Sequence, residues 1–352
     1  MNTIHIAASR EYDVLIGHGL LDELGTLAAG AVDAKTAAIV LDDSVFALYG
    51  KRAAAALERA GLRVISFVFP HGESSKNLTV YGQVLNFLCE NRVSRTDVVV
   101  ALGGGVVGDL AGFAAATYLR GIRFIQVPTT LLAMVDSSVG GKTAVDLDGG
   151  KNQAGAFWQP SLVVCDCDVL DTLPEREYRC GCAEVIKYGL LNNAPFFNDL
   201  METPAKEQYE HVISTCVEMK KQVVLSDEFD RGARQKLNLG HTIGHAVEQC
   251  SGFTLLHGEC VAIGMAVITR AAVKKGFCAK ETLDEVEKIL KLYDLPDQTT
   301  YSTDELLNVA LADKKVANGK ISLIVPEAVG KCSILPVPAE ALREWMQAGG
   351  IV

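Results

Sequence analysis

The sequence lacks any uninterrupted apolar run long enough to cross a membrane, which takes about 20 residues. Its N-terminus lacks a basic segment followed by an apolar stretch, so we expect no secretory signal peptide. Positive charge is scarce: the chain has 33 Lys and Arg residues and 43 Asp and Glu residues, which gives a formal net charge of −10. This balance argues against nucleic acid or an anionic membrane as the main partner. It still allows a local lysine cluster to bind a small anion, and we expect a cytoplasmic protein.

The chain also lacks cysteine pairs with the two-residue spacer of a zinc knuckle, although it contains 10 cysteines. A single residue separates Cys165 from Cys167 and Cys180 from Cys182. Cys165 and Cys167 occupy alternate positions of a strand-like run, which favours packed side chains. We therefore expect thiols in a reducing compartment, without a structural metal or disulfides.

No compositional bias towards disorder is present, since 49% of the residues are apolar and 22% are charged. A chain of 352 residues is too long for one ordinary hydrophobic core, so two domains are expected. No internal repeat or low-complexity linker marks the boundary between them.

The first half alternates short apolar runs with segments of helical period. Continuous apolar runs between helices predict a parallel sheet that is covered on both faces. The residues at 1–20 are predicted to form an antiparallel edge hairpin. The runs predicted as strands are 36–43, 63–70, 97–105, 122–128 and 161–166.

Strand signals stop near Leu173, and the helical period then prevails, with one late exception at 320–337 that predicts a hairpin. We therefore predict an α/β chain in two parts. A Rossmann-like parallel-sheet nucleotide-binding domain spans 1–173, and a mostly α-helical domain spans 174–352.

A glycine-rich turn supports the nucleotide-binding prediction. Gly103, Gly105 and Gly108 stand in G-x-G-x-x-G register after a predicted strand and before a predicted helix. Such glycines let backbone N–H groups approach a pyrophosphate at the N-terminus of a helix. No acidic residue follows at the usual distance of about 20 residues, although Asp42 and Asp43 could bind a ribose instead. The alternative is a tight turn that binds nothing.

A second polar region, 127–157, combines glycines with side chains suited to phosphate binding. The alternative is a solvated loop, but the segment contains little flexible filler. Its candidate residues are Thr129, Thr130, Asp136, Lys142, Lys151 and Asn152.

Three of the seven histidines, His241, His245 and His257, lie within 17 positions of one another. His241 and His245 share one face of a predicted helix, but Thr242 rules out the H-E-x-x-H motif of metalloproteases. Three such residues with a carboxylate would suit zinc and leave an open position. Spacing alone does not say which histidine stays off the metal, nor which acid completes the site among Glu184, Glu248 and Glu259.

Seven motifs follow one another along the chain: HGESSK (71–76), GGGVVGD (103–109), VPTTLLAMVDSSVGGKTAVD (127–146), GGKNQAGAFWQP (149–160), AEVIKYG (183–189), LNLGHTIGHAVE (237–248) and LHGE (256–259). Together they resemble the 3-dehydroquinate synthase family of sugar-phosphate cyclases. The resemblance covers nearly the whole chain. It implies a lyase of the shikimate pathway that converts 3-deoxy-D-arabino-heptulosonate 7-phosphate to 3-dehydroquinate and phosphate. The reaction would proceed by transient oxidation with NAD, phosphate elimination, re-reduction and aldol closure.

The resemblance implies two cofactors, NAD and one divalent metal, zinc or cobalt. The implied metal ligands are Glu184, His241 and His257, which leaves His245 as a catalytic group. The implied NAD contacts are Asp42, Glu73, Lys76, Gly105, Val106, Val107, Gly108, Asp109, Thr129, Thr130, Lys142, Lys151, Val169, Leu170, Asp171 and Thr172.

The resemblance also implies a small anionic substrate and a homodimer, because the counterpart of Arg120 can come from the neighbouring subunit. The implied substrate contacts are Arg120, Asn152, Lys220, Arg234 and Lys314, with Lys315 as the neighbouring alternative. The implied catalytic residues are Asp136, Lys142, Lys187, Asn238 and His245.

Three other functions remain open from the sequence. A related cyclase would act on a different sugar phosphate, but Lys220 and Arg234 suit a carboxylated substrate. An oxidoreductase of the glycerol-dehydrogenase kind would release NADH in proportion to product. A non-catalytic nucleotide-binding protein would need no metal ligands.

Overall fold

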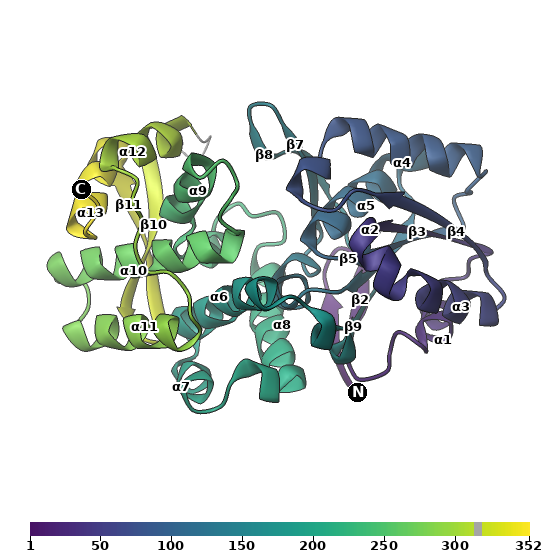
Figure 1. Ribbon diagram of the computed structural model, residues 1–352, viewed down its shortest axis with the longest axis horizontal. Coiled ribbons are helices and arrows are strands. Elements are labelled where there is room, and N and C mark those ends of the chain that lie inside the picture. Colours follow the sequence, from purple (N-terminus) through teal and green to yellow (C-terminus); the bar gives the residue numbers. More distant parts are fainter. Residues whose placement is uncertain (313–318) are drawn as a thin grey trace. The chain divides into compact units, whose positions relative to one another are not determined.

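The computed structural model describes residues 1–312 and 319–352 and divides into two compact units (Figure 1). Unit 1 comprises Met1–Leu173 and Tyr209–Phe229, and unit 2 comprises Pro174–Gln208 and Asp230–Val352. The sequence-based division assigned all of 174–352 to the second domain. In the structure, α8 (Tyr209–Ser226) belongs to unit 1. It packs against β1 (Asn2–Ala7), β2 (Glu11–Gly17) and the π-helix η4 (Ala133–Ser137), and its residues Ile213 and Val217 are buried.

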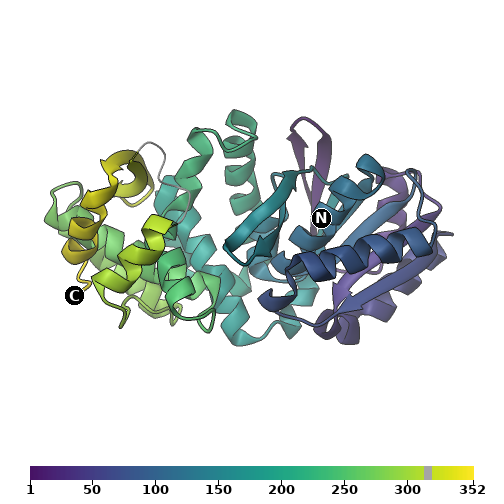
Figure 2. The ribbon, with the colours of Figure 1, turned by 90° about the horizontal axis from the view of Figure 1, so that it is seen from above.

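Unit 1 is built on a seven-stranded sheet with the order β1-β2-β9-β6-β5-β3-β4. All pairs are parallel except the edge hairpin β1–β2, drawn in purple beside the N label in Figure 2. The predicted parallel sheet with an antiparallel edge hairpin is confirmed. The strands are β1 (Asn2–Ala7), β2 (Glu11–Gly17), β3 (Thr36–Asp42), β4 (Arg63–Phe69), β5 (Val98–Gly103), β6 (Arg123–Pro128) and β9 (Leu162–Asp166).

Both faces of the central strands are covered, which explains their continuous apolar character. Val40 and Val99 pack into a core cluster with Leu110 of α5 and Val84 of α4. Ile39 points to the opposite face and is equally buried. Besides α8, the helices of this unit are α1 (Leu24–Ala31), α2 (Asp43–Val45), η1 (Phe46–Gly50), α3 (Lys51–Arg59), η2 (Glu73–Ser75), α4 (Leu78–Glu90), α5 (Gly105–Thr117), η3 (Tyr118–Arg120), η4 (Ala133–Ser137) and η5 (Cys167–Thr172).

The polar region 127–157 is ordered rather than a loop. It contains η4 and a hairpin formed by β7 (Lys142–Leu147) and β8 (Gly150–Phe157). β8 carries exposed and half-buried residues in alternation, so it lacks the apolar run from which the other strands of this unit were predicted. α5 packs against β7, and this contact holds the hairpin on unit 1.

Unit 2 is mostly helical, as predicted, with one hairpin of β10 (Lys320–Ala328) and β11 (Lys331–Pro338). α10 is buried along most of its length and packs against α6, α9, α11, α13 and β10. None of the helices in the described residues is long and apolar enough to span a membrane. The helices are α6 (Glu175–Asn192), α7 (Ala194–Glu202), η6 (Ala205–Glu207), η7 (Ala233–Asn238), α9 (His241–Cys250), α10 (His257–Lys274), α11 (Lys280–Leu292), α12 (Thr303–Ala312), η8 (Ala339–Ala341) and α13 (Leu342–Ala348).

Glycines allow α6 and α9 to approach the backbone of α10. A Cβ atom at Gly264 would lie 1.9 Å from the carbonyl oxygen of Gly240, and one at Gly258 would lie 2.1 Å from that of Cys180. Gly240 has a φ of 77°, in the left-handed region that favours glycine, and it immediately precedes α9. These contacts fix the spacing of the three helices at the level of their backbones.

Substitution of Gly264 by Ala should therefore destabilise the protein. The added methyl group has no space, and we expect a loss of about 1–3 kcal/mol in the free energy of unfolding, measured by urea denaturation. Gly82→Ala on α4 is the matched control, since no atom lies within 4 Å of its added Cβ atom and alanine favours helix by up to about 1 kcal/mol. Equal stability of the Gly264 variant and the parent would contradict this account of the packing.

Candidate active site

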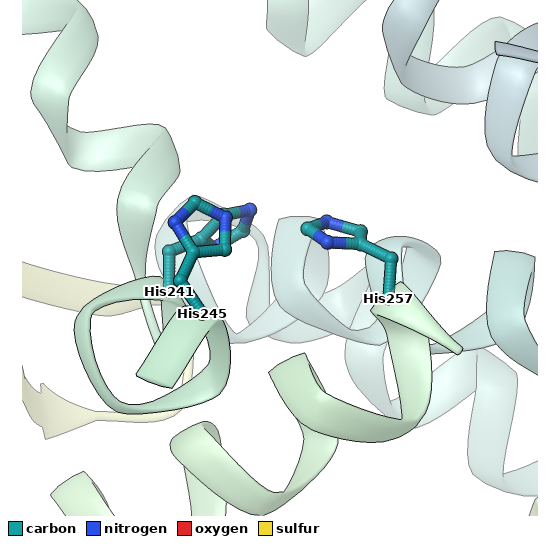
Figure 3. Close-up of side chains that lie close together, drawn as sticks. All are labelled: His241, His245 and His257. Atoms are coloured by element: carbon teal, nitrogen blue, oxygen red, sulfur yellow. The ribbon is translucent and has the colours of Figure 1, made fainter. Parts of the chain in front are cut away.

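Three imidazole rings meet where α9 and α10 begin. His241 is the first residue of α9, His245 lies one turn further on, and His257 is the first residue of α10. Figure 3 shows the ring of His257 facing the other two. The ring centroid of His241 lies 5.2 Å from that of His245 and 5.2 Å from that of His257, and one nitrogen of each ring lies within 4.8 Å of the others. The histidines are thus close enough together to share a metal ion.

Glu184 of α6 brings a carboxylate to two of these rings. Its Oε1 atom lies 3.3 Å from Nε2 of His257 and 3.6 Å from Nε2 of His241. One carboxylate oxygen and two imidazole nitrogens therefore converge. Catalytic zinc sites use this combination of ligand atoms, with three protein ligands and a fourth position left open. These residues fit a divalent metal ion.

The other two candidate acids face elsewhere. The carboxylate of Glu259 accepts hydrogen bonds from Nε and Nη2 of Arg176, each at 2.7 Å, and from the backbone N–H of Leu256, just before α10. Glu248 lies 3.5 Å from Nδ1 of His257, on the side of the ring away from Glu184. Glu184 is therefore the acid that faces Nε2 of both histidines.

Hydrogen bonding orients His241 for metal binding. Its Nδ1 atom lies 2.9 Å from the carbonyl oxygen of Leu239. Because a carbonyl oxygen only accepts, Nδ1 carries the proton and donates it. Nε2 then has a lone pair directed at Glu184, which is the tautomer a metal ligand needs.

The charges around His257 favour a cation. Burial alone would lower the pKa of this imidazole, but hydrogen bonds with Glu184 and Glu248 outweigh burial and raise its pKa to about 9. Lys187, one turn after Glu184 on α6, adds an ion pair to the same carboxylate and is itself only 1% exposed. Two buried acids thus gather positive charge between α6, α9 and α10.

The other predicted residues of unit 2 belong to the segment that leads into α9. Arg234 and Asn238 lie on η7, which contacts α6, β10 and β11, and Arg234 is buried. The structure thus brings together Glu184, Lys187 and the three histidines directly, and η7 lies immediately before α9 in the chain. Lys314 and Lys315 lie outside the described residues.

The predicted nucleotide residues gather in unit 1. β5 ends at Gly103 and α5 begins at Gly105, which confirms the strand–turn–helix context of the glycine motif. A Cβ atom at Gly103 would lie 2.4 Å from Cγ2 of Val107, so the turn requires glycine there. The first turn of α5 carries the predicted contacts Gly105, Val106, Val107, Gly108 and Asp109.

A polar network centred on the buried Lys76 links this helix to the β7–β8 hairpin. Lys76 Nζ donates to Asp109 Oδ2 and to Asn152 Oδ1, both at 2.6 Å. Lys151 pairs with Glu73 at 3.0 Å. Burial raises the pKa of Asp109, in opposition to the charge of Lys76. Five residues predicted from three different motifs are therefore joined in one cluster.

Asp146 belongs to this network but was not predicted. Its Oδ1 atom accepts the N–H of Asn152 at 2.7 Å, and Asn152 has a left-handed φ of 55°. The signal available in the sequence was the turn-forming stretch DLDGGKN, which places an acid just before a tight hairpin.

The remaining predicted residues of unit 1 lie on α8, at the ends of strands and in short helices. Lys220 of α8 pairs with the Asp136 carboxylate at 3.0 Å and also donates to the Asp136 carbonyl oxygen, so these two predicted residues contact each other. Arg120 lies in η3 with a φ of 69°. The others are Asp42 at the end of β3, Thr129 and Thr130 after β6, Lys142 at the start of β7, and Val169, Leu170, Asp171 and Thr172 in η5.

Comparison with known proteins identifies relatives over nearly the whole chain. The family model for 3-dehydroquinate synthase N-terminal matches residues 66–180, and the model for 3-dehydroquinate synthase C-terminal matches residues 181–316. The 3-dehydroquinate synthase of Streptococcus suis is 42% identical over 343 residues, which cover 96% of this chain and 97% of that protein.

Two solved structures have closely similar folds. A 2-deoxy-scyllo-inosose synthase complexed with carbaglucose-6-phosphate, NAD+ and Co2+ has a TM-score of 0.87 at 26% identity, covering 98% of this chain and 99% of that one. ValA, a 2-epi-5-epi-valiolone synthase from Streptomyces hygroscopicus with NAD+ and Zn2+ bound, also has a TM-score of 0.87, at 28% identity, covering 96% of each chain.

Substitution of single ligands should distinguish two possible donor sets, Glu184 with two histidines or all three histidines. We expect His257→Ala to weaken zinc binding by more than about 100-fold, since even residues that only orient a ligand contribute about 10–100-fold. His245→Ala should keep one zinc ion per chain. The measurement is metal content after dialysis against a weak chelator, with circular dichroism as the check on folding. Equal metal loss in both variants would favour the three-histidine set.

Proposed function

Because the chain belongs to the 3-dehydroquinate synthase family, we propose that it converts 3-deoxy-D-arabino-heptulosonate 7-phosphate to 3-dehydroquinate and phosphate. The protein would thus be a lyase of the shikimate pathway. The observation that carries the proposal is the convergence of Glu184 Oε1 with Nε2 of His241 and of His257, at the motif positions where the family resemblance places the metal.

We include two cofactors in the proposal. Unit 1 would bind NAD through the glycine turn and the network around Lys76, and unit 2 would hold one zinc or cobalt ion. The cofactors named in the titles of the two similar structures support this choice. When bound, NAD accepts and returns a hydride, and the metal ion polarises a substrate hydroxyl as a Lewis acid.

The residues around the metal centre have groups suited to proton transfer and orientation. His245 presents its ring 5.2 Å from that of His241 and 5.6 Å from that of His257, measured between centroids. We propose that its imidazole accepts or returns a proton of the substrate, as histidine does in general acid–base catalysis. The Lys187 ammonium, paired with Glu184, would stabilise oxyanion character on the substrate hydroxyls.

The anionic groups of the substrate need cations that water does not screen. In unit 2 the buried guanidinium of Arg234 meets this requirement for a carboxylate. In unit 1 the proposed substrate contacts are Arg120, Asp136, Lys142, Asn152 and Lys220, of which Lys220 is buried. Buried lysine and arginine side chains explain how a chain of net charge −10 can bind a multiply charged anion.

The oligomeric state and the cellular compartment of the protein are also part of the proposal. We propose a homodimer in the cytoplasm, because the family resemblance implies that the residue matching Arg120 reaches the neighbouring subunit. The left-handed backbone at Leu119 and Arg120 shows that this segment is held in a specific conformation.

Phosphate release with NAD far below substrate is the direct test of the proposed reaction. An internal redox cycle returns the hydride in every turnover, so we expect many phosphates released per NAD, with no net rise in absorbance from NADH. The control omits NAD from protein that has first been stripped of it. Release that stops near one phosphate per NAD while NADH accumulates would indicate an oxidoreductase instead.

A further inference from the structure

Glu248 has no assigned role, yet it is buried beside the proposed metal centre. It lies on α9, seven residues after His241 and three after His245, so all three share one face of the helix. Only 4% of Glu248 is exposed. Its Oε2 atom lies 3.5 Å from Nδ1 of His257, which belongs to α10. α9 therefore supplies His241 and a carboxylate that reaches the histidine of the next helix.

We propose that Glu248 is a positioning residue for His257. Its carboxylate accepts the Nδ1–H of the ring, so that Nε2, which faces Glu184 Oε1 at 3.3 Å, is the nitrogen that would bind the metal ion. This inference rests on the proposed function, in which His257 is a metal ligand. It concerns the orientation of that ligand and does not add a ligand to the set.

The geometry excludes Glu248 as a ligand of the same ion. The two nitrogens of an imidazole direct their lone pairs away from each other. Glu248 faces Nδ1 of His257, whereas Glu184 faces Nε2. A metal bound at Nε2 beside Glu184 is therefore out of reach of Glu248, which acts through the ring.

The carboxylate of Glu248 should orient His257 more strongly than the neutral carbonyl of Leu239 orients His241. His241 donates its Nδ1–H to the carbonyl oxygen of Leu239, and His257 faces a charged group. A charge-assisted hydrogen bond is about twice as strong as a neutral one, and it makes the ring a better donor to a metal.

The position of His257 at the start of its helix explains why this histidine, rather than His241, has a charged hydrogen-bond partner. His257 is the first residue of the 18-residue helix α10. The positive end of the helix dipole disfavours a cation there, and the Glu248 carboxylate offsets this effect.

The test is the affinity for cobalt(II), followed by its visible absorption, in Glu248→Gln, Glu248→Ala and the parent. Residues that orient a metal-bound histidine contribute about 10–100-fold to affinity. We expect the Ala variant to bind cobalt about 10–100-fold more weakly. The Gln variant should lie between it and the parent, since its amide oxygen still accepts the Nδ1–H. Glu175→Gln, at an exposed position of α6, is the matched control and should bind like the parent.

A second pair of variants separates positioning from a general structural role. In a His257→Ala background, Glu248→Gln should cause no further loss of cobalt affinity, because the ring it orients is gone. An equal further loss in that background would overturn the proposal, as would unchanged affinity in both single variants. If Glu248→Ala does not fold, the near-isosteric Gln variant decides. The two proposals can fail separately. If the parent protein releases phosphate with NAD but the Glu248 variants bind cobalt as tightly as the parent, this inference is overturned and the proposed function stands.

Discussion

The carboxylate of Glu184 determines the arrangement of unit 2 around it. It is only 1% exposed, and a buried anion is costly unless cations and hydrogen bonds surround it. Lys187 comes from the same helix, His241 from α9 and His257 from α10. A divalent ion held by Glu184 and the two imidazoles would satisfy the same requirement, so the interaction that organises these helices also suits the metal site that we propose.

Backbone packing makes this convergence possible. The side chains of Glu184, His241 and His257 reach one another only because α6 and α9 both lie close to α10. Gly240, Gly258 and Gly264 permit that approach, since a Cβ atom at any of them would lie within 2.7 Å of a backbone oxygen. The proposed metal site would therefore depend on residues that carry no functional group, and a volume change at one of these glycines would alter the spacing of the proposed ligands.

Most of the fold could be predicted from the sequence, and the exceptions have physical reasons. Apolar runs such as 36–43 and 161–166 revealed the buried strands, because both faces of the sheet are covered. α8 was assigned to the wrong part, since the helical period does not reveal the packing partner of a helix. The β7–β8 hairpin was missed because β7 has only a short buried stretch and β8, with two glycines and exposed or half-buried residues throughout, has no apolar run. The spacing of the histidines pointed to a metal, but the choice of Glu184, 57 residues before His241, came from the family resemblance.

The central claim is that one metal ion is bound by Glu184, His241 and His257, and a crystal structure of the zinc-loaded protein tests it most directly. The account predicts one anomalous difference peak per chain at the zinc edge, within about 2.0–2.2 Å of a Glu184 oxygen and of Nε2 of both histidines. Zinc bound by His241, His245 and His257 without Glu184, or no peak at these residues, would contradict it.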